Sequence, residues 1–400
     1  MTFISIAFFV LFVITYLILK VVKKHNQRLF ILLFASYFFY AWWDIRFLLL
    51  MILEEFLCYF LAKKIERNRR SDISKWYLLL GVLIPTLAIF FFKYWGFVQD
   101  TLGDLFGLFQ KERYSIVLPI GISFYTFQMI SYVVDVYNGK IKACKSFVRF
   151  SLYVSFFPQL VAGPIVRANE FLPQLDQDKE LTWENLGVGL QIFVFGAFKK
   201  IVIADRLAVC VDSVFAVPEA YSGAALLCAV FSYFIQIYCD FSGYSDMAIG
   251  IAKVLGYDLC VNFNIPYLAS NPTEFWKRWH ISLSRWLQDY IYIPLGGNRK
   301  GTIRRYMNLF LTMLIGGLWH GANWTFVIWG ALHGLALIVH KIFVTYVPRI
   351  TLSRQEMRVI SKIGCIMCNN AFVMFCWIFF RAQSVSDAFC IIGRIVFCNP

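Results

Sequence analysis

Long apolar runs separated by short polar segments fill the first third of the chain. Residues 1–19 carry no charge and end at Lys20, and further runs occupy Leu29–Trp43, Phe47–Ala62 and Trp76–Phe97. A helix needs about 20 apolar residues to cross a bilayer core. The pattern therefore predicts a series of transmembrane helices. The first is not a cleaved signal, because it has no basic n-region and no A-x-A site.

The regular alternation continues through a mixed loop at 98–115 and an apolar run at Ile116–Val136, and then ends. Phe147–Val161 is apolar but contains Pro158 and is followed by Pro164, so we expect a re-entrant segment and not a full span. Further helices are predicted at Leu186–Phe198, Ala224–Tyr238 and Phe241–Leu255. We interpret Asp240 and Asp246 as capping residues in a Ser/Gly-rich turn between the last two.

The composition strengthens this interpretation. The residues AVILMFWYC make up 60% of the 400 residues and charged residues only 16%, and the mean hydropathy is +0.64. Soluble domains are about 45–50% apolar and about 25% charged. We therefore predict an all-α polytopic membrane protein, with a ceiling of roughly twelve spans.

The net charge of +14 comes from 38 Lys+Arg against 24 Asp+Glu. Many of the positive residues gather in short loops, at 20–28, 63–75 and 140–149. This is the positive-inside pattern of cytoplasmic loops, and it predicts an N-terminus outside the cell. We expect the membrane lipid bilayer as a partner of the protein, and no nucleic acid.

Two acids, Glu54 and Glu55, lie in the middle of the run Phe47–Ala62. Acidic residues at membrane depth are costly and usually face a cavity or a partner. The alternative is a short segment that is locally wetted, and the sequence leaves both interpretations open.

The first stretch with candidate chemistry is Asn271–Gly301. Asn271 suits an N-cap, Pro272 the first helical turn, and Glu274 a capping box. The following residues present an aromatic face at helical spacing, made by Trp276, Trp279, His280, Leu283, Trp286, Leu287 and Tyr290. Basic residues crowd the other side, so the pattern predicts a helix lying in the membrane interface.

The second stretch, Tyr306–His340, has 35 consecutive residues without Asp, Glu, Lys or Arg. One helix of that length would reach about 52 Å, well beyond the bilayer core of about 30 Å. We therefore expect two half-helices with a break at Gly316–Asn323, which places His320 on irregular backbone inside the membrane. An ionisable residue there is a candidate functional group, and an imidazole can act as a general base near neutral pH.

The remaining candidates are weaker. We interpret His333 and His340 as hydrogen-bonded or interfacial histidines without a functional role, and His280 as ambiguous. A metal site from His280, His320 and His333 is disfavoured, and we predict none, because the sequence shows no thiol or acid set beside them. We interpret the lone C-x-x-C at 365–368 as two small apolar residues on one helix face.

Several of these stretches together resemble the membrane-bound O-acyltransferase family, closest to its alginate O-acetyltransferase branch. The resemblance runs through most of the chain, at Ala41–Trp43, Leu118–Tyr125, Ala162–Pro164, Asp240–Gly250, Phe275–Ser284, Asp289–Arg299 and Gly316–Asn323. It implies a ring of tilted helices around a funnel or tunnel. It also implies that His320 is the near-invariant catalytic histidine. His280 would be the second active-site position, which holds asparagine, aspartate or histidine.

The same resemblance implies an acetyltransferase that needs no bound cofactor. Acetyl-CoA would approach from the cytoplasm, and its phosphates would meet some of five candidates: Lys277, Arg278, Arg285, Arg299 and Lys300. The acetyl group would leave on the far side, where a separate extracytoplasmic SGNH-type transferase often delivers it to a polysaccharide, either an exopolysaccharide or peptidoglycan. Such a protein would lie in the bacterial inner membrane.

Three alternatives stay open: a D-alanyl transferase acting on teichoic acids from a carrier protein, a transporter without chemistry, and a scaffold. Residues 1–400 are expected to form one membrane domain. Its parts would be N-terminal helices at 1–136, a catalytic core at 137–345 and C-terminal helices at 346–400. Members of the branch usually continue with further helices, so we expect a truncated or shorter form.

Overall fold

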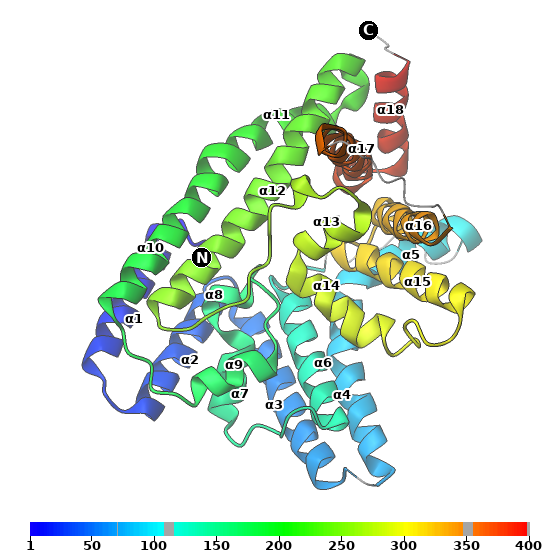
Figure 1. Ribbon diagram of the computed structural model, residues 1–400. Coiled ribbons are helices and arrows are strands. Elements are labelled where there is room, and N and C mark those ends of the chain that lie inside the picture. The colour runs from blue at the N-terminus through cyan, green and yellow to red at the C-terminus, as the bar shows by residue number, and fades with distance from the viewer. Residues whose placement is uncertain (70, 108–115, 347–354, 398–400) are drawn as a thin grey trace. The chain divides into compact units, whose positions relative to one another are not determined.

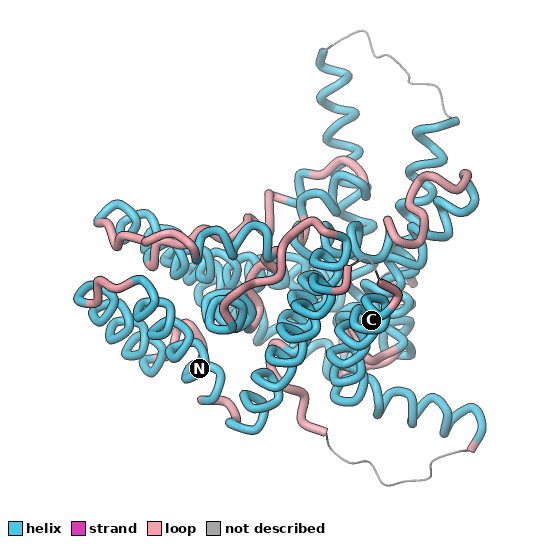
Figure 2. Tube along the Cα trace, turned by 90° about the horizontal axis from the view of Figure 1, so that it is seen from below, coloured by secondary structure: helices cyan, strands magenta, loops and turns pink. Residues whose placement is uncertain are grey.

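The computed structural model describes residues 1–69, 71–107, 116–346 and 355–397. Every regular element in these ranges is a helix (Figures 1 and 2). Among the described residues, five helical segments are long and apolar enough to cross a membrane: Ile73–Phe106, Trp183–Ala216, Gly223–Val254, Trp324–Tyr346 and Val359–Arg381. The predicted all-α, multi-pass membrane class is confirmed, while the ring around a funnel stays a prediction.

The chain divides into two compact units. The first unit comprises Met1–Ala197 and Tyr244–Cys260, and the second comprises Phe198–Gly243 and Val261–Pro400. The helix α12 (Gly223–Val254) contributes residues to both. The predicted parts at 1–136, 137–345 and 346–400 stay a prediction.

The first unit is built from the helices of the N-terminal half. These are α1 (Ile6–Val21), α2 (His25–Ala41), α3 (Ile45–Arg67), α4 (Ile73–Ile89), α5 (Trp95–Phe106), α6 (Ile122–Asn138), α7 (Phe147–Ser155), α8 (Phe157–Leu160), α9 (Ala168–Leu175) and α10 (Trp183–Ala197). A π-helical turn at Phe90–Tyr94 joins α4 to α5. The loop expected at 98–115 is therefore wrong for residues 98–106, which belong to α5. Residues 108–115 lie outside the described ranges.

The segment expected to be re-entrant contributes buried residues to the core of the first unit. Its two short helices, α7 and α8, meet at Phe156, whose ψ of 110° interrupts the helix one residue before Phe157 and two before Pro158. Phe150, Phe156 and Phe157 are all fully buried. The break expected from the prolines is confirmed, and protein covers the irregular backbone, as a low-dielectric setting requires.

The second unit holds the remaining helices. They are α11 (Asp205–Ala216), α13 (Pro272–Arg278), α14 (Ile281–Leu287), α15 (Thr302–His320), α16 (Trp324–Tyr346), α17 (Gln355–Arg381) and α18 (Val385–Val396). π-helical turns occupy Phe198–Ala204 and Gln288–Tyr292. Buried aromatic residues of α13, α16 and α17 form the centre of its core.

The turn expected at Asp240–Asp246 is wrong, because α12 runs through it without interruption. Within the second unit, Lys200 of the π-helical turn forms ion pairs with Asp240 at 2.5 Å and with Asp205 at 2.8 Å. The adjacent Lys199 donates to the Ser242 hydroxyl at 3.0 Å. A neighbouring helix therefore satisfies these polar side chains, so they do not cap a helix end.

Candidate active site

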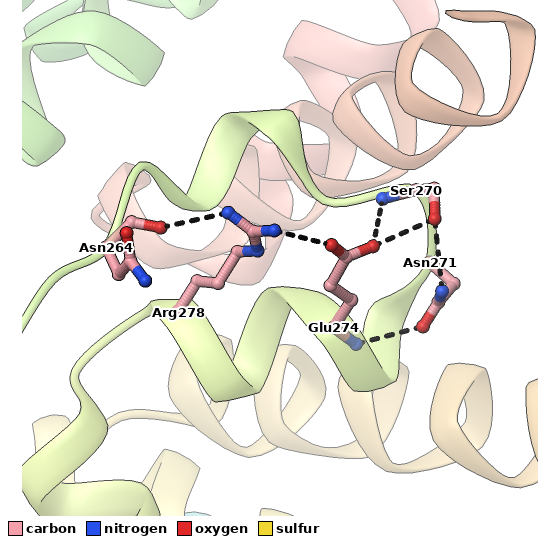
Figure 3. Close-up of polar contacts among 5 residues, drawn as sticks. All are labelled: Asn264, Ser270, Asn271, Glu274 and Arg278. Carbon is pink, nitrogen blue, oxygen red and sulfur yellow. Dashed lines mark hydrogen bonds and ion pairs between the residues drawn. The ribbon is translucent and has the colours of Figure 1, made fainter. Parts of the chain in front are cut away.

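The helix α13 begins with a polar network around Glu274 (Figure 3). Asn271 is the N-cap, as predicted, and its side-chain oxygen accepts from the Glu274 amide at 2.9 Å. The Glu274 carboxylate, however, accepts from the amide and hydroxyl of Ser270, at 2.9 and 2.8 Å, and not from the Asn271 amide. The expected capping box therefore closes one residue earlier.

Arg278 completes this network. It donates to the other Glu274 oxygen at 2.8 Å and to the Asn264 carbonyl at 3.4 Å (Figure 3). The Ser270 amide, with smaller contributions from the Ser270 hydroxyl and Arg278, holds the pKa of Glu274 below its ordinary value. Arg278 thus ties the end of α13 to the segment that precedes it.

The single interfacial helix expected after Asn271 is wrong, because it breaks between Arg278 and Ile281. His280 stands at the break with φ 42° and ψ 57°, in the left-handed region that few residues other than glycine adopt. Two backbone hydrogen bonds to the upstream residues 262 and 264 hold it there. The Ile281 amide donates to the Asn262 carbonyl, and the Asn264 amide donates to the Arg278 carbonyl, both at 2.9 Å.

The buried side chain of Asn262 organises the break. Its amide oxygen accepts from the Ser282 amide at 3.2 Å and from the Ser282 hydroxyl at 2.9 Å. The His280 Nδ1 lies 3.1 Å from the same oxygen. Because a carbonyl oxygen can only accept, Nδ1 must carry the proton in this bond, and a neutral imidazole then has an unprotonated Nε2. Asn262 therefore sets His280 in the form that can accept a proton.

His280 and His320 both contact one indole. The ring centroid of Trp319 lies 6.0 Å from that of His280 and 4.8 Å from that of His320, both in edge-on geometry. His280 is fully buried, whereas His320 is half-buried. The structure thus gathers the two predicted catalytic histidines around Trp319, with His320 the more open to a substrate.

Two further aromatic rings pack against His320. Its ring lies edge-on to Trp329 at 5.1 Å and to Phe380 at 5.0 Å. Trp329 itself is 1% exposed. The low polarity of these rings strengthens any charge–charge or hydrogen-bond interaction made at the imidazole.

The break expected within Tyr306–His340 occurs at Gly321–Asn323, just after His320. His320 is the last residue of α15, so the expectation of irregular backbone at this residue is wrong by one position. The expectation of half-helices is also wrong for α16, which extends past His340 to Tyr346 and is long enough to cross a membrane.

Glycines let α15 and α16 approach closely. A Cβ atom at Gly317 would lie 2.3 Å from the Phe326 carbonyl oxygen, and one at Gly330 would lie 2.6 Å from that of Met313. Small residues at such crossings allow the close backbone contact that stabilises helix pairs in membranes. The crossing fixes Trp329, next to Gly330, against His320.

The interpretation of His333 and His340 as hydrogen-bonded residues is confirmed. The Trp276 indole donates to the Nδ1 of buried His333 at 3.3 Å, and the His340 Nδ1 lies 2.9 Å from the Thr273 hydroxyl. The His333 ring also packs against Trp329, with centroids 4.8 Å apart. Both histidines therefore attach α16 to α13.

The five candidate donor-binding cations differ in their surroundings. Lys277, Arg285, Arg299 and Lys300 are exposed, whereas Arg278 is half-buried in its ion pair with Glu274. Within the described ranges, no group of three or more His, Cys, Asp or Glu residues is arranged to hold a metal ion.

Sequence reasoning missed Asn262, Trp319 and the Trp276–His333 pair. Asn262 lies 18 residues before His280, and the sequence between them holds no signal that connects the two. Trp319 was visible as the neighbour of His320, but its contact with His280 requires the fold.

The fold and this site define a class: an all-helical, multi-pass membrane protein with two histidines gathered inside a bundle of apolar helices. The model of the membrane-bound O-acyltransferase family matches residues 142–383. The chain belongs to the membrane-bound O-acyltransferase family, and it is an O-acyltransferase.

Curated relatives cover most of the chain. It is 41% identical over 393 residues to the probable alginate O-acetylase AlgI of Pseudomonas aeruginosa, covering 97% of this chain and 73% of the relative. It is 39% identical over 397 residues to the peptidoglycan O-acetyltransferase of Helicobacter pylori, covering 92% and 73%. Similarity to the teichoic acid D-alanyltransferase of Bacillus subtilis is lower, at 26% over 288 residues, covering 68% and 70%.

Proposed function

We propose that the protein moves an acetyl group from cytoplasmic acetyl-CoA across the bacterial inner membrane for O-acetylation of an extracytoplasmic polysaccharide. The observation that carries this proposal is the pairing of His280 and His320 around Trp319. The relatives named for alginate and peptidoglycan acetylation support the acetyl group and the glycan class.

In the proposed reaction, half-buried His320 accepts the proton of an acceptor hydroxyl as the oxygen attacks the thioester carbonyl. A C–O bond forms, the C–S bond breaks, and the CoA thiolate leaves and is reprotonated from the imidazolium. General-base help of this kind contributes about 10²–10⁴-fold to a rate. His280, held through Nδ1 by Asn262, acts as a positioning residue for this centre.

The donor is proposed to meet the exposed cations that flank the site. Lys277, Arg285, Arg299 and Lys300 suit an anionic CoA better than Arg278, because Arg278 is already paired with Glu274. The final transfer to the glycan is assigned to a separate extracytoplasmic SGNH-type partner.

A D-alanyl transferase is the second candidate, because two relatives carry that name. The lower identity to them, 24–26% against 39–44% for the acetylating relatives, favours acetyl transfer. A carrier-dependent enzyme would leave acetyl-CoA intact.

The test is thioester cleavage of radiolabelled acetyl-CoA by the purified chain in nanodiscs, with and without extracted cell glycan. We expect turnover by the wild type and its loss in His320→Ala. His25→Ala is the matched control, since His25 bonds the Leu175 carbonyl and Asp178 in the first unit. Equal turnover in His320→Ala and wild type would overturn the role of His320. No wild-type turnover would overturn direct acetyl-CoA chemistry.

A further inference from the structure

The acid pair of α3 is enclosed by protein, which settles the alternatives left by the sequence. Glu54 is 2% exposed and Glu55 is 0% exposed. Helices packed against α3 therefore cover both side chains. The structure thus excludes a locally wetted segment and leaves two acids inside the first unit.

Only one of the two carboxyls has a clear hydrogen-bond partner. The Tyr37 hydroxyl donates to Glu55 Oε2 at 2.5 Å. Glu55 Oε1 and both oxygens of Glu54 have no hydrogen-bond partner among the described residues. No described lysine, arginine or histidine forms an ion pair with either carboxyl.

Neutral oxygens from three other helices complete the cluster. The hydroxyls of Tyr40 on α2 and Tyr125 on α6 lie close to each other and to both acids, and Ser151 on α7 lies close to Glu55. None of these three hydroxyls makes a hydrogen bond of normal geometry with a described residue. Tyr40 is 2% exposed and Tyr125 and Ser151 are 0% exposed. Six buried oxygen atoms therefore lie in the neighbourhood of the acid pair without a hydrogen bond of normal geometry.

Buried polar atoms in a protein are almost always satisfied, and buried negative charge must be neutralised. Protons alone would neutralise the acids, but the hydroxyls of Tyr40, Tyr125 and Ser151 make no hydrogen bond of normal geometry to the carboxyls. A hard cation fits a set made only of oxygen atoms. With two carboxyls, one proton and one monovalent cation bring the cluster to zero charge.

We propose that Glu54, Glu55, Tyr40, Tyr125 and Ser151 form a binding site for one sodium ion within the first unit. Bound sodium would hold α2, α3, α6 and α7 together. This proposal concerns a different part of the chain from the histidine site and does not depend on the proposed acetyl transfer.

The test is direct binding of ²²Na⁺ to the full chain in nanodiscs, together with its thermal stability in NaCl or choline chloride at equal ionic strength. We expect saturable binding of one ion and a rise in Tm with NaCl that choline does not reproduce. Glu54→Gln should weaken sodium binding at least about tenfold, the equivalent of about 1.4 kcal/mol. The matched control is Glu184→Gln, on an exposed residue of α10 in the same unit, which should bind as the wild type does.

Tyr40→Phe and Tyr125→Phe keep the ring volume and remove one ligand each, so they test the site even if Glu54→Gln folds poorly. Each should weaken binding while the chain remains folded. Absence of ²²Na⁺ binding by folded wild type would overturn the proposal. The proposal would also be overturned if a change of pH or Ca²⁺ stabilised the protein while Na⁺ did not. Unchanged sodium affinity in folded Glu54→Gln would overturn it as well.

Discussion

His280 in the second unit and Glu54 in the first unit are both buried polar side chains in an apolar bundle. His280 has a dedicated partner, because Asn262 holds its Nδ1 and also ties down Ser282. Glu54 has no such partner among the described residues. At the first site a neighbouring side chain holds the histidine, whereas at the second site buried oxygens lack hydrogen-bond partners among the described residues.

This difference separates two uses of a buried polar group. A histidine that positions a reacting centre needs a fixed tautomer and orientation, which a neighbouring amide supplies. A carboxyl that binds an ion must keep its lone pairs available until the ion arrives. The following substitutions test this distinction.

Removing the indole of Trp329 should have the largest effect, because this residue packs His320 and His333 and is 1% exposed. We expect Trp329→Ala to lower the free energy of unfolding by about 3–5 kcal/mol. Chemical denaturation in nanodiscs measures it. Trp76→Ala, at a residue 65% exposed, should change it far less. Equal losses would show that packing around His320 is not special.

Asn262→Ala removes the partner that orients His280 and leaves donors of His280 and Ser282 buried. Leaving one buried donor unpaired costs about 1–3 kcal/mol. Because His280 and Ser282 make further interactions, we expect a total loss of stability in that range. Turnover should fall about tenfold, a loss of about 1.4 kcal/mol in transition-state stabilisation. Asn262→Asp, which keeps the acceptor oxygen, should recover part of the turnover. Full activity in folded Asn262→Ala would refute the positioning role.

Tyr37→Phe makes the corresponding change in the first unit, where it removes the hydroxyl that donates to Glu55. A single hydrogen bond contributes about 1 kcal/mol, so a loss of that size is expected in saturating NaCl. Turnover should be unaffected. Tyr346→Phe, at a residue 70% exposed, is the control. A fall in turnover as large as that of Asn262→Ala would break the distinction between the two sites.

Glu274→Gln should have the smallest effect, because its partners Ser270 and Arg278 form a partly exposed network. The pKa of Glu274 lies below its ordinary value of 4.5. Its carboxylate therefore contributes stability above that value, and the contribution is lost as the pH falls through the depressed pKa. We expect a deficit under about 1 kcal/mol at pH 7, disappearing in acid. A deficit that grows in acid would contradict this sign.

The sequence predicted structure correctly where the signal lies within a short stretch of chain, such as the length of an apolar run or the residues that start a helix. The charge-free length of Tyr306–His340 predicted a break near His320, and Asn271 with Pro272 predicted the start of α13. The same reasoning failed where a distant residue decides the local structure. Asn262 bonds the residues at the break near His280, and Lys200 forms an ion pair with Asp240 in the middle of α12.

The acid pair shows a second limit of sequence reasoning. The cost of Glu54 and Glu55 at membrane depth was evident from their position, but burial by α2, α6 and α7 depends on tertiary packing. No local pattern places Tyr40, Tyr125 and Ser151 around them, because these residues are separated by long stretches of chain.

The left-handed backbone at His280 also limits which residues can evolve at this position. Asn, Asp and His are the residues other than glycine that adopt φ near 42° most readily. They are also the three residue types that the family resemblance implies for this site. The backbone conformation therefore restricts the residues tolerated at position 280, independently of their chemistry. It favours side chains that can form hydrogen bonds with Asn262, and it disfavours β-branched residues.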